Sequence, residues 1–296
     1  MIWPQPLTLA LAENMLYGGQ VASAPDGSYS LAWSALNEMG IRQVFFQRFS
    51  PSGQALSPEP TSITDSIYNQ ALKLIRTSNG NYILLTKSPS FASVHRLDPQ
   101  GNLLNTNITY GHYVWPDARL DLVPDLSGGA WLSCQTNSNP RRKINHIDAE
   151  SDYASTSGLW IEPVNTLTSG TNFVPQADGT VLCGFSHGGQ LRLMRVTTNL
   201  QINMDVSITT DSPDIQDTRL FQDAAGNLVW IYHKNESGDH LFRAIKTNTQ
   251  GVLLWDQPLE LLEPGMNYSP NSWDAIALED GSFLFSYSYR MGNSYA

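Results

Sequence analysis

Residues 71–85, ALKLIRTSNGNYILL, place an Asn79-Gly80 turn between the apolar run Ala71 to Ile75 and a second apolar run, Tyr82 to Leu85. Asn-Gly or Asp-Gly between two such runs is the strongest short-range signal for a β-hairpin, because these turns need positive φ. The arrangement recurs along the chain, which indicates a repeat protein. Its turns are Asp26-Gly27, Asn79-Gly80, Gly128-Gly129, Asp178-Gly179, Ala225-Gly226 and Asp280-Gly281, and successive second glycines are 53, 49, 50, 47 and 55 residues apart.

Each hairpin is followed, about 20 residues later, by a third strand-like run that leads into another turn and a short outer strand. Val94 to Leu97 is such a run, and Leu103 to Asn105 is the outer strand after it. Four strands in about 50 residues make one propeller blade. The sequence therefore predicts one all-β domain, a six-bladed β-propeller of four-stranded antiparallel blades. The predicted repeats are 11–66, 67–115, 116–162, 163–211, 212–262, and 263–296 together with 1–10.

The chain ends suggest how the ring closes. The sixth repeat has its first hairpin, Trp273 to Tyr289, but no full outer strand before Ala296. Near the other end, Ile2 to Leu7 (IWPQPL) matches the outer strand of the fifth repeat, Leu254 to Leu259 (LWDQPL). We therefore expect the N-terminal strand to complete the last blade, which also removes an exposed sheet edge. A larger parent protein cut inside a blade is the alternative.

Composition excludes several partners. The formal net charge is −10, so a nucleic acid is not expected, because phosphate binding needs a concentrated basic face. No apolar run approaches the roughly 18 to 20 residues that span a bilayer, so membrane insertion is not expected.

Cys134 and Cys183 fall in strand-like runs and are predicted to be buried free thiols. Their distances from the preceding turn glycine differ by one residue, which predicts that they lie on opposite sheet faces.

Residues 26–57, DGSYSLAWSALNEMGIRQVFFQRFSPSGQALS, resemble repeats of large secreted bacterial proteins, which read Asp-Gly-aliphatic-Trp and then aromatic-Gln-Arg-Phe-Asp before a Gly turn. Residues 128–160 and 225–255 are more loosely similar. The resemblance implies an extracellular or cell-surface propeller module of the adhesin-like type, and it carries no catalytic residue set.

The N-terminus shows neither a basic nor an apolar signal region, so the chain is either intracellular or lacks its signal peptide. The sialidase aspartate box and the blade-ending Trp-Asp of the WD40 family are absent.

The first strand of each blade would line the central channel, so its early polar residues would surround one mouth. Two repeats share a motif there, Asp117-Ala118-Arg119-Leu120 and Asp217-Thr218-Arg219-Leu220. Such residues could bind a polar ligand such as a sugar through charge-assisted hydrogen bonds. Alternatively, the Asp and Arg groups pair across adjacent blades. The predicted ligand-binding residues are Asn69, Asp117, Arg119, Asn172, Asp217, Arg219 and Asp274.

Catalysis and metal binding have weaker support. Asp117, Asp217 and Asp274 could act as an acid and a base in hydrolysis, but no catalytic residue is predicted. No HExxH motif or close His/Cys cluster is present, so neither a metal nor a cofactor is expected, and calcium in the channel has no support.

Charged residues outside the channel suggest scaffold roles. Third-strand positions carry Arg48, Arg96, His146 and Arg195 in register, and we expect them to pair between blades with turn acids such as Asp98 and Asp148. The hairpin 137–143, which ends in Arg141-Arg142-Lys143, and the segment 234–239 between His233 and His240 are expected to be solvated tips.

The combined pattern favours a non-enzymatic binding or assembly module, exported to the cell surface or beyond, that recognises a glycan or a protein on a propeller face. One alternative is a glycoside hydrolase or lyase that uses the channel-mouth carboxylates. A second alternative is a self-assembling structural subunit of a surface layer or phage particle.

Overall fold

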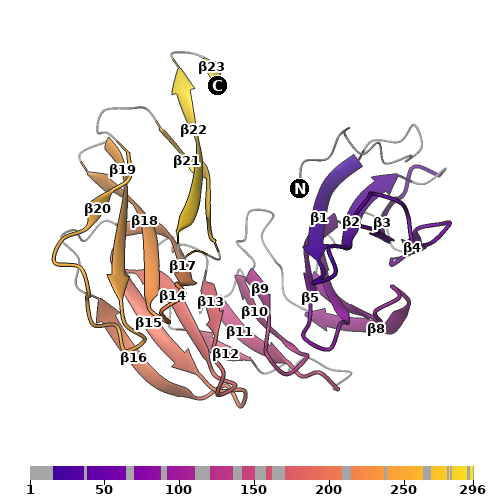
Figure 1. Ribbon diagram of the computed structural model, residues 1–296, viewed down its shortest axis with the longest axis horizontal. Coiled ribbons are helices and arrows are strands. Elements are labelled where there is room, and N and C mark those ends of the chain that lie inside the picture. Colours follow the sequence, from indigo (N-terminus) through magenta and orange to yellow (C-terminus); the bar gives the residue numbers. More distant parts are fainter. Residues whose placement is uncertain are drawn as a thin grey trace. The chain divides into compact units, whose positions relative to one another are not determined.

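The computed structural model describes residues 16–36, 39–64, 70–87, 92–110, 121–135, 142–150, 158–161, 171–208, 215–236, 239–262, 268–278, 280, 282–291 and 294–295. These residues form six antiparallel sheets, five with four strands and one with three, and no helix. Consecutive strands are neighbours in every sheet (Figure 1). The prediction of an all-β chain built from four-stranded antiparallel sheets is confirmed.

The strands fall into two compact units, Met1–Ser138 with Arg142–Trp160, and Asn139–Arg141 with Ile161–Ala296. The first unit holds three sheets. Their strands are β1 (Leu16–Ser23), β2 (Tyr29–Leu36), β3 (Arg42–Phe49) and β4 (Thr61–Ser62); β5 (Gln70–Arg76), β6 (Tyr82–Lys87), β7 (Ala92–Leu97) and β8 (Leu103–Tyr110); and β9 (Asp121–Pro124), β10 (Ala130–Gln135), β11 (Arg142–Ile147) and β12 (Leu159–Ile161), the last of which ends at the boundary.

The second unit holds the other three sheets. Their strands are β13 (Asn172–Pro175), β14 (Val181–His187), β15 (Gln190–Val196) and β16 (Ile202–Ile208); β17 (Ile215–Gln222), β18 (Leu228–Glu236), β19 (Asp239–Thr247) and β20 (Leu259–Glu260); and β21 (Tyr268–Ala277), β22 (Phe283–Met291) and β23 (Ser294–Tyr295). The segment Ile2 to Leu7, which was expected to close a ring, lies outside the described residues.

The hairpin turns fix the register of the first two strands in each sheet. Gly27, Gly80, Gly179 and Gly226 have positive φ, and in each turn a backbone N–H donates to the carbonyl of the residue after the glycine. In the third sheet the equivalent glycine is Gly128, because Asp125 N donates to Gly129 O. The repeat therefore has to be counted from Gly128 and not, as predicted, from Gly129.

This change in register corrects one prediction about the cysteines. Cys134 and Cys183 are buried free thiols, as predicted. Counted from Gly128 and Gly179, both follow the turn glycine by an even number of residues. They therefore lie on the same side of their respective sheets, and the prediction of opposite faces is wrong.

Apolar side chains from alternate strand positions fill the spaces between sheets within each unit. In the first unit, Phe46 from β3 packs with Tyr82 and Leu84 from β6, and Leu85 from β6 packs with Leu132 from β10. In the second unit, Gly184 on β14 lets Leu220 and Trp230 of the next sheet approach closely. A Cβ at position 184 would lie 2.5 Å from Leu220 Cδ2 and 2.8 Å from the Trp230 ring. The sheets thus pack face to face through aliphatic and aromatic side chains.

The third-strand basic residues pair mainly inside their own sheet, which corrects their predicted partners. Arg195 lies 3.3 Å from Asp178, His146 Nε2 lies 2.7 Å from Asp125, and the equivalent Lys246 lies 2.6 Å from Asp223. The register explains this, since each of these residues lies opposite a second-strand residue close to the hairpin turn. The two predicted acceptors accept hydrogen bonds from backbone N–H groups of their own turns. Asp98 accepts from Gln100 N and Asn102 N, and Asp148 accepts from Glu150 N. Among the third-strand basic residues, Arg96 contacts the neighbouring sheet, where it donates to Ala149 O over 2.6 Å.

Asp125 shows how such a turn carboxylate is stabilised. Its burial alone would raise the pKa, but hydrogen bonds from His146, Ser127 and Gly129 outweigh that effect and lower it. The carboxylate therefore stays charged while buried, and it ties the turn to the third strand.

His95 gives the first unit a predictable acid sensitivity. It is buried on β7, its Nε2 lies 2.9 Å from Thr86 Oγ1, and burial lowers its pKa from 6.5 to about 4. Below pH 6.5 the unfolded chain binds a proton that the folded protein resists, so this part of the stability is lost between pH 6.5 and about 4. The loss amounts to about 3 kcal/mol. Urea unfolding of His95→Gln across this pH window should show a flatter profile than the parent. Equal slopes for H95Q and the parent would contradict the assignment.

Candidate functional site

One position on the first strand of every sheet carries a polar side chain. It lies seven residues before the turn glycine, and in the structure it is opposite the residue five after that glycine. Equal register places these residues at the same height on their respective first strands. We call them the first-strand polar residues: Gln20, Lys73, Asp121, Asn172, Arg219 and Asp274.

In the first unit, two of these residues join neighbouring sheets. Lys73 Nζ on β5 donates to Asp121 Oδ1 on β9 over 3.1 Å, and the same oxygen accepts from Leu122 N. Both side chains are partly exposed. An ion pair in contact with water is worth at most about 1 kcal/mol, so it orients the strands more than it stabilises them.

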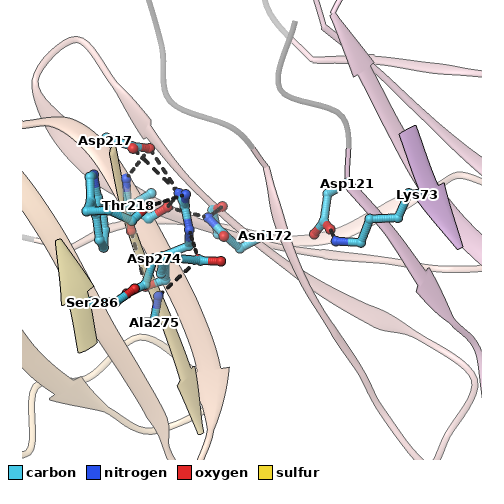
Figure 2. A network of polar contacts seen from close by, with 11 residues as sticks. Lys73, Asp121, Asn172, Asp217, Thr218, Asp274, Ala275 and Ser286 are labelled. Carbon is cyan, nitrogen blue, oxygen red and sulfur yellow. Dashed lines mark hydrogen bonds and ion pairs between the residues drawn. The ribbon is translucent and has the colours of Figure 1, made fainter. Parts of the chain in front are cut away.

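In the second unit, Arg219 is the centre of a larger network. Figure 2 labels its partners Asp217, Thr218 and Asp274. The Nε of Arg219 donates to Asp274 Oδ1 on β21 over 2.9 Å, and its guanidinium lies 4.6 Å from the ring centroid of Trp273. The same group donates to Thr218 O, to Trp273 O and, over 3.4 Å, to Asp217 Oδ1. Arg219 thus ties β17 to β21 with a planar, multiply bonded group.

Asn172 extends this network to the sheet before it. Its Nδ2 donates to Thr218 O over 2.9 Å, so β13 is linked to β17 at the strand where Arg219 begins the link to β21. Three consecutive first strands of the second unit are therefore joined through one residue of β17 and its neighbours (Figure 2).

Charged and titratable side chains are buried beside Arg219. Asp217, His233 and Lys234 are all nearly inaccessible to solvent, and Asp217 is directly opposite His233 in the β17–β18 register. The His233 ring lies 5.0 Å from that of Phe242. Lys234, the first residue of the segment 234–239 that was predicted to be a solvated tip, is therefore internal. It belongs to the strand β18, and the strand's long paired register carries it into the core.

The structure separates the predicted ligand-binding residues into three groups. Asn172, Arg219 and Asp274 occupy equivalent positions and take part in sheet-to-sheet contacts. Asp217 lies two residues before Arg219 and is buried. Asn69, Asp117 and Arg119 lie outside the described residues. Whether any of the seven residues contacts a ligand stays a prediction. The alternative, in which Asp and Arg side chains pair between sheets, is observed for Arg219 and Asp274.

Sequence reasoning missed Lys73 and Asp121. It chose Asn69 and Asp117, each four residues too early, because it aligned the Asp-x-Arg-Leu motifs with each other. A usable signal was present, since counting back seven residues from each turn glycine finds all six positions. In the third repeat this count works only from Gly128, the glycine that follows Ser127.

The chemistry of the network is that of ion pairing. Arg219 commits its Nε and donors on both terminal nitrogens to partners within the protein, and it faces two carboxylates. Asp274 is the outermost member, with its side chain largely exposed and its Oδ1 accepting from both Arg219 and Ala275 N. Within the described part of the chain, no group of three or more His, Cys, Asp or Glu side chains could hold a metal ion.

No protein-family model and no curated protein matches this sequence. Solved structures are similar in fold at low sequence identity. A protein of unknown function from Dyadobacter fermentans has a TM-score of 0.55 at 13% identity, over 95% of this chain and 92% of that one. A Glu150Gln mutant of the Synechocystis apocarotenoid oxygenase has 0.51 at 13%, over 87% of this chain and 64% of that one. A prolyl endopeptidase has 0.50 at 11%, over 90% of this chain and 37% of that one.

These likenesses concern the fold alone. Together with the repeated four-stranded antiparallel sheets, they define the protein as a β-propeller-like, all-β protein. Within the described residues, no helix is long and apolar enough to cross a bilayer.

The two ion-pair sites should differ in their effect on stability. Arg219→Met removes a counter-ion of the buried Asp217, so we expect it to lower the free energy of unfolding by about 3 kcal/mol. Lys73→Met breaks a partly exposed pair and should cost less than about 1 kcal/mol. Urea denaturation of both variants at neutral pH measures the difference, and equal losses would show that the Arg219 network is not the stronger joint.

Proposed function

We propose that the protein is a non-enzymatic binding or assembly module, exported from the cell, that presents a propeller face to a glycan or a protein partner. The observation that carries this proposal is the set of first-strand polar residues. Their side chains combine charged and amide groups at one height of successive strands, with Lys73 and Asp274 reaching solvent. Such groups suit the recognition of hydroxyl-rich or charged ligands.

The same proposal includes a six-bladed ring closed by the N-terminal strand Ile2 to Leu7. It is supported by apolar residues that remain exposed on the two end sheets. Ile276 and Leu284 are opposite each other on β21 and β22 and are 53% and 57% exposed, and Val21 on β1 is 63% exposed. Apolar pairs at inner sheet positions usually pack against another sheet, and a closed ring would cover them.

Small-angle X-ray scattering of the monomer tests the ring. A compact fold of 296 residues should have a radius of gyration of about 19 Å. A closed six-bladed ring predicts this value together with a single compact particle shape. A clearly larger radius with two resolved lobes would contradict closure and would leave only the separate sheet stacks.

Binding is favoured over hydrolysis by how the carboxylates are used. Hydrolysis by an acid and a base needs two carboxyl groups that face one substrate. One of them has to be protonated so that it can donate a proton to the leaving group. Asp217 is buried, and Asp217 and Asp274 both face the guanidinium of Arg219, which makes them its counter-ions. Glycoside hydrolysis remains the second candidate because two of its proposed carboxylates do meet at one group.

A glycan array followed by calorimetry on the strongest hits tests the proposed function. We expect a ligand whose affinity falls at least about tenfold in Lys73→Met or Asp274→Asn, since each change removes a charged hydrogen-bonding group. Glu59→Gln, at an exposed site away from the first strands, is the matched control and should bind as the parent does. Hydrolysis of array glycans that Asp274→Asn abolishes would favour the hydrolase, and stable homo-oligomers without ligand binding in native mass spectrometry would favour the structural subunit.

A further inference from the structure

The second strand of the sixth sheet, β22, has an open outer edge. In the other five sheets a third strand pairs with the second strand along its length. In the sixth sheet the third strand is β23, which pairs only with Arg290 and Met291 at the far end of β22 (Figure 1). Within the described residues, no strand pairs with the outer edge of β22 between Phe283 and Ser286. Such an edge presents backbone N–H and C=O groups that can pair with another chain.

The side chains of this stretch are more exposed than their equivalents in the other sheets. Residues two to five after the turn glycine are buried in the other five sheets, except for Leu31, which is partly exposed. In β22 the same positions are Phe283 to Ser286. Leu284 is 57% exposed, Ser286 is exposed, and both phenylalanines are partly exposed.

The open edge accounts for the exposure of Phe283 and Phe285. Both rings point toward the fifth sheet, whose side chains they contact. The centroid of the Phe283 ring lies 6.0 Å from that of Phe221, and the centroid of the Phe285 ring lies 5.3 Å from that of Phe242. Closing the ring of sheets would cover Leu284, which is on the opposite face, but it would not cover these two rings. A third strand beside β22 would cover them.

The third strands of the other five sheets show which chemistry fits this edge. Each contains an apolar residue, any residue, a basic residue, and then an apolar residue or Thr. The five segments are FQRF (46–49), VHRL (94–97), INHI (144–147), LMRV (193–196) and AIKT (244–247). In each sheet the basic residue lies opposite the second-strand residue that is three after the turn glycine. In β22 that position is Leu284.

Asp280, in the turn before β22, is the equivalent of Asp178 in the fourth sheet. Asp178 accepts from the third-strand Arg195 over 3.3 Å and from the Thr180 hydroxyl over 2.6 Å. Asp280 likewise accepts from Ser282 Oγ over 2.6 Å, and this bond lowers its pKa, so it is a carboxylate at neutral pH. Asp280 is exposed, and among the described residues no Lys, Arg or His forms an ion pair with it.

We propose that the outer edge of β22 binds an extended apolar–x–basic–apolar segment of a partner protein as an added antiparallel third strand. The backbone of the segment pairs with β22, and its basic side chain reaches Asp280. Its last apolar residue and the residue before the basic one cover Phe283 and Phe285. The fifth sheet shows the same arrangement within one chain, where Lys246 of the third strand lies opposite Val229.

Two other occupants fit less well. The chain's own Ile2 to Leu7 has no basic residue, its two prolines lack N–H groups, and it matches an outer strand, which pairs beyond a third strand. A second copy of the chain would have to release a third strand that is already paired in its own sheet. The inference is separate from the proposed function, because the first-strand polar residue of this sheet, Asp274, lies on β21 at the other edge of β22.

Fluorescence anisotropy of the full chain with a labelled peptide copy of β15, Gln190–Val196, tests the proposal. In the proposed register, Arg195 of the peptide lies opposite Leu284. We expect a Kd of about 0.1 mM or tighter. Hydrogen exchange should slow at Phe283 to Ser286 when the peptide is added and should not change at the equivalent Leu228 to Ile231. A scrambled peptide of the same composition should not bind.

Asp280→Ala should weaken peptide binding about two- to fivefold, as expected for an exposed ion pair. The fifth sheet has Ala225 at the equivalent turn position, so alanine is compatible with this turn. Asp178→Ala removes the equivalent carboxylate of the fourth sheet. It is the matched control and should bind the peptide as the parent does. Equal affinities of Asp280→Ala and the parent would contradict the proposed position of the basic residue.

Several results would overturn the proposal. These are no binding of the peptide, equal binding of the scrambled peptide, and binding without protection of β22. Slow exchange of Phe283 to Ser286 in the dilute parent without peptide would show that the chain's own residues fill the edge. Protection that rises with protein concentration alone would assign the edge to a second copy. Glycan binding without peptide binding would overturn this inference and leave the proposed function standing.

Discussion

The backbone conformation of one glycine in each hairpin sets much of the rest of the structure. Positive φ at Gly80 or Gly226 closes a tight turn, and the turn fixes which residue of the first strand is opposite which residue of the second. A slip of one residue would reverse every side chain between the two faces of the sheet. The same register therefore decides both which apolar residues enter the core and which polar residue contacts the next sheet.

The polar contacts differ in strength although they occupy equivalent positions. Lys73 and Asp121 meet where water reaches both, whereas Arg219 contacts the buried Asp217, two backbone carbonyls and an aromatic ring. Removing water strengthens such contacts and raises the cost of losing one partner. The network around β17 is thus the stronger joint. Asp274 is the exposed end of this network.

Local sequence was sufficient to predict the all-β fold, because Asn-Gly and Asp-Gly turns between apolar runs have one common structural outcome. It was not sufficient to predict the sheet-to-sheet partners, which depend on register to the nearest residue. In the third repeat, the pair Gly128-Gly129 offered two turn glycines, and choosing the wrong one placed Cys134 on the wrong face. Burial of Lys143, Lys234 and His233 could not be predicted either, since a charged residue beside a hairpin tip is usually solvated. Only the long pairing of β18 with β19, and the closeness of Gly158 to β11, bring these side chains inside.

Residues at one register position join successive sheets within each unit, and a double-mutant cycle between Arg219 and Asp274 tests this most directly. The two residues are 55 positions apart in sequence and meet only if β17 and β21 pack in the described register. Unfolding free energies of Arg219→Met, Asp274→Asn and the double variant should give a coupling energy of about 0.5 kcal/mol or more. Additive effects, with a coupling below about 0.3 kcal/mol, would contradict the claim.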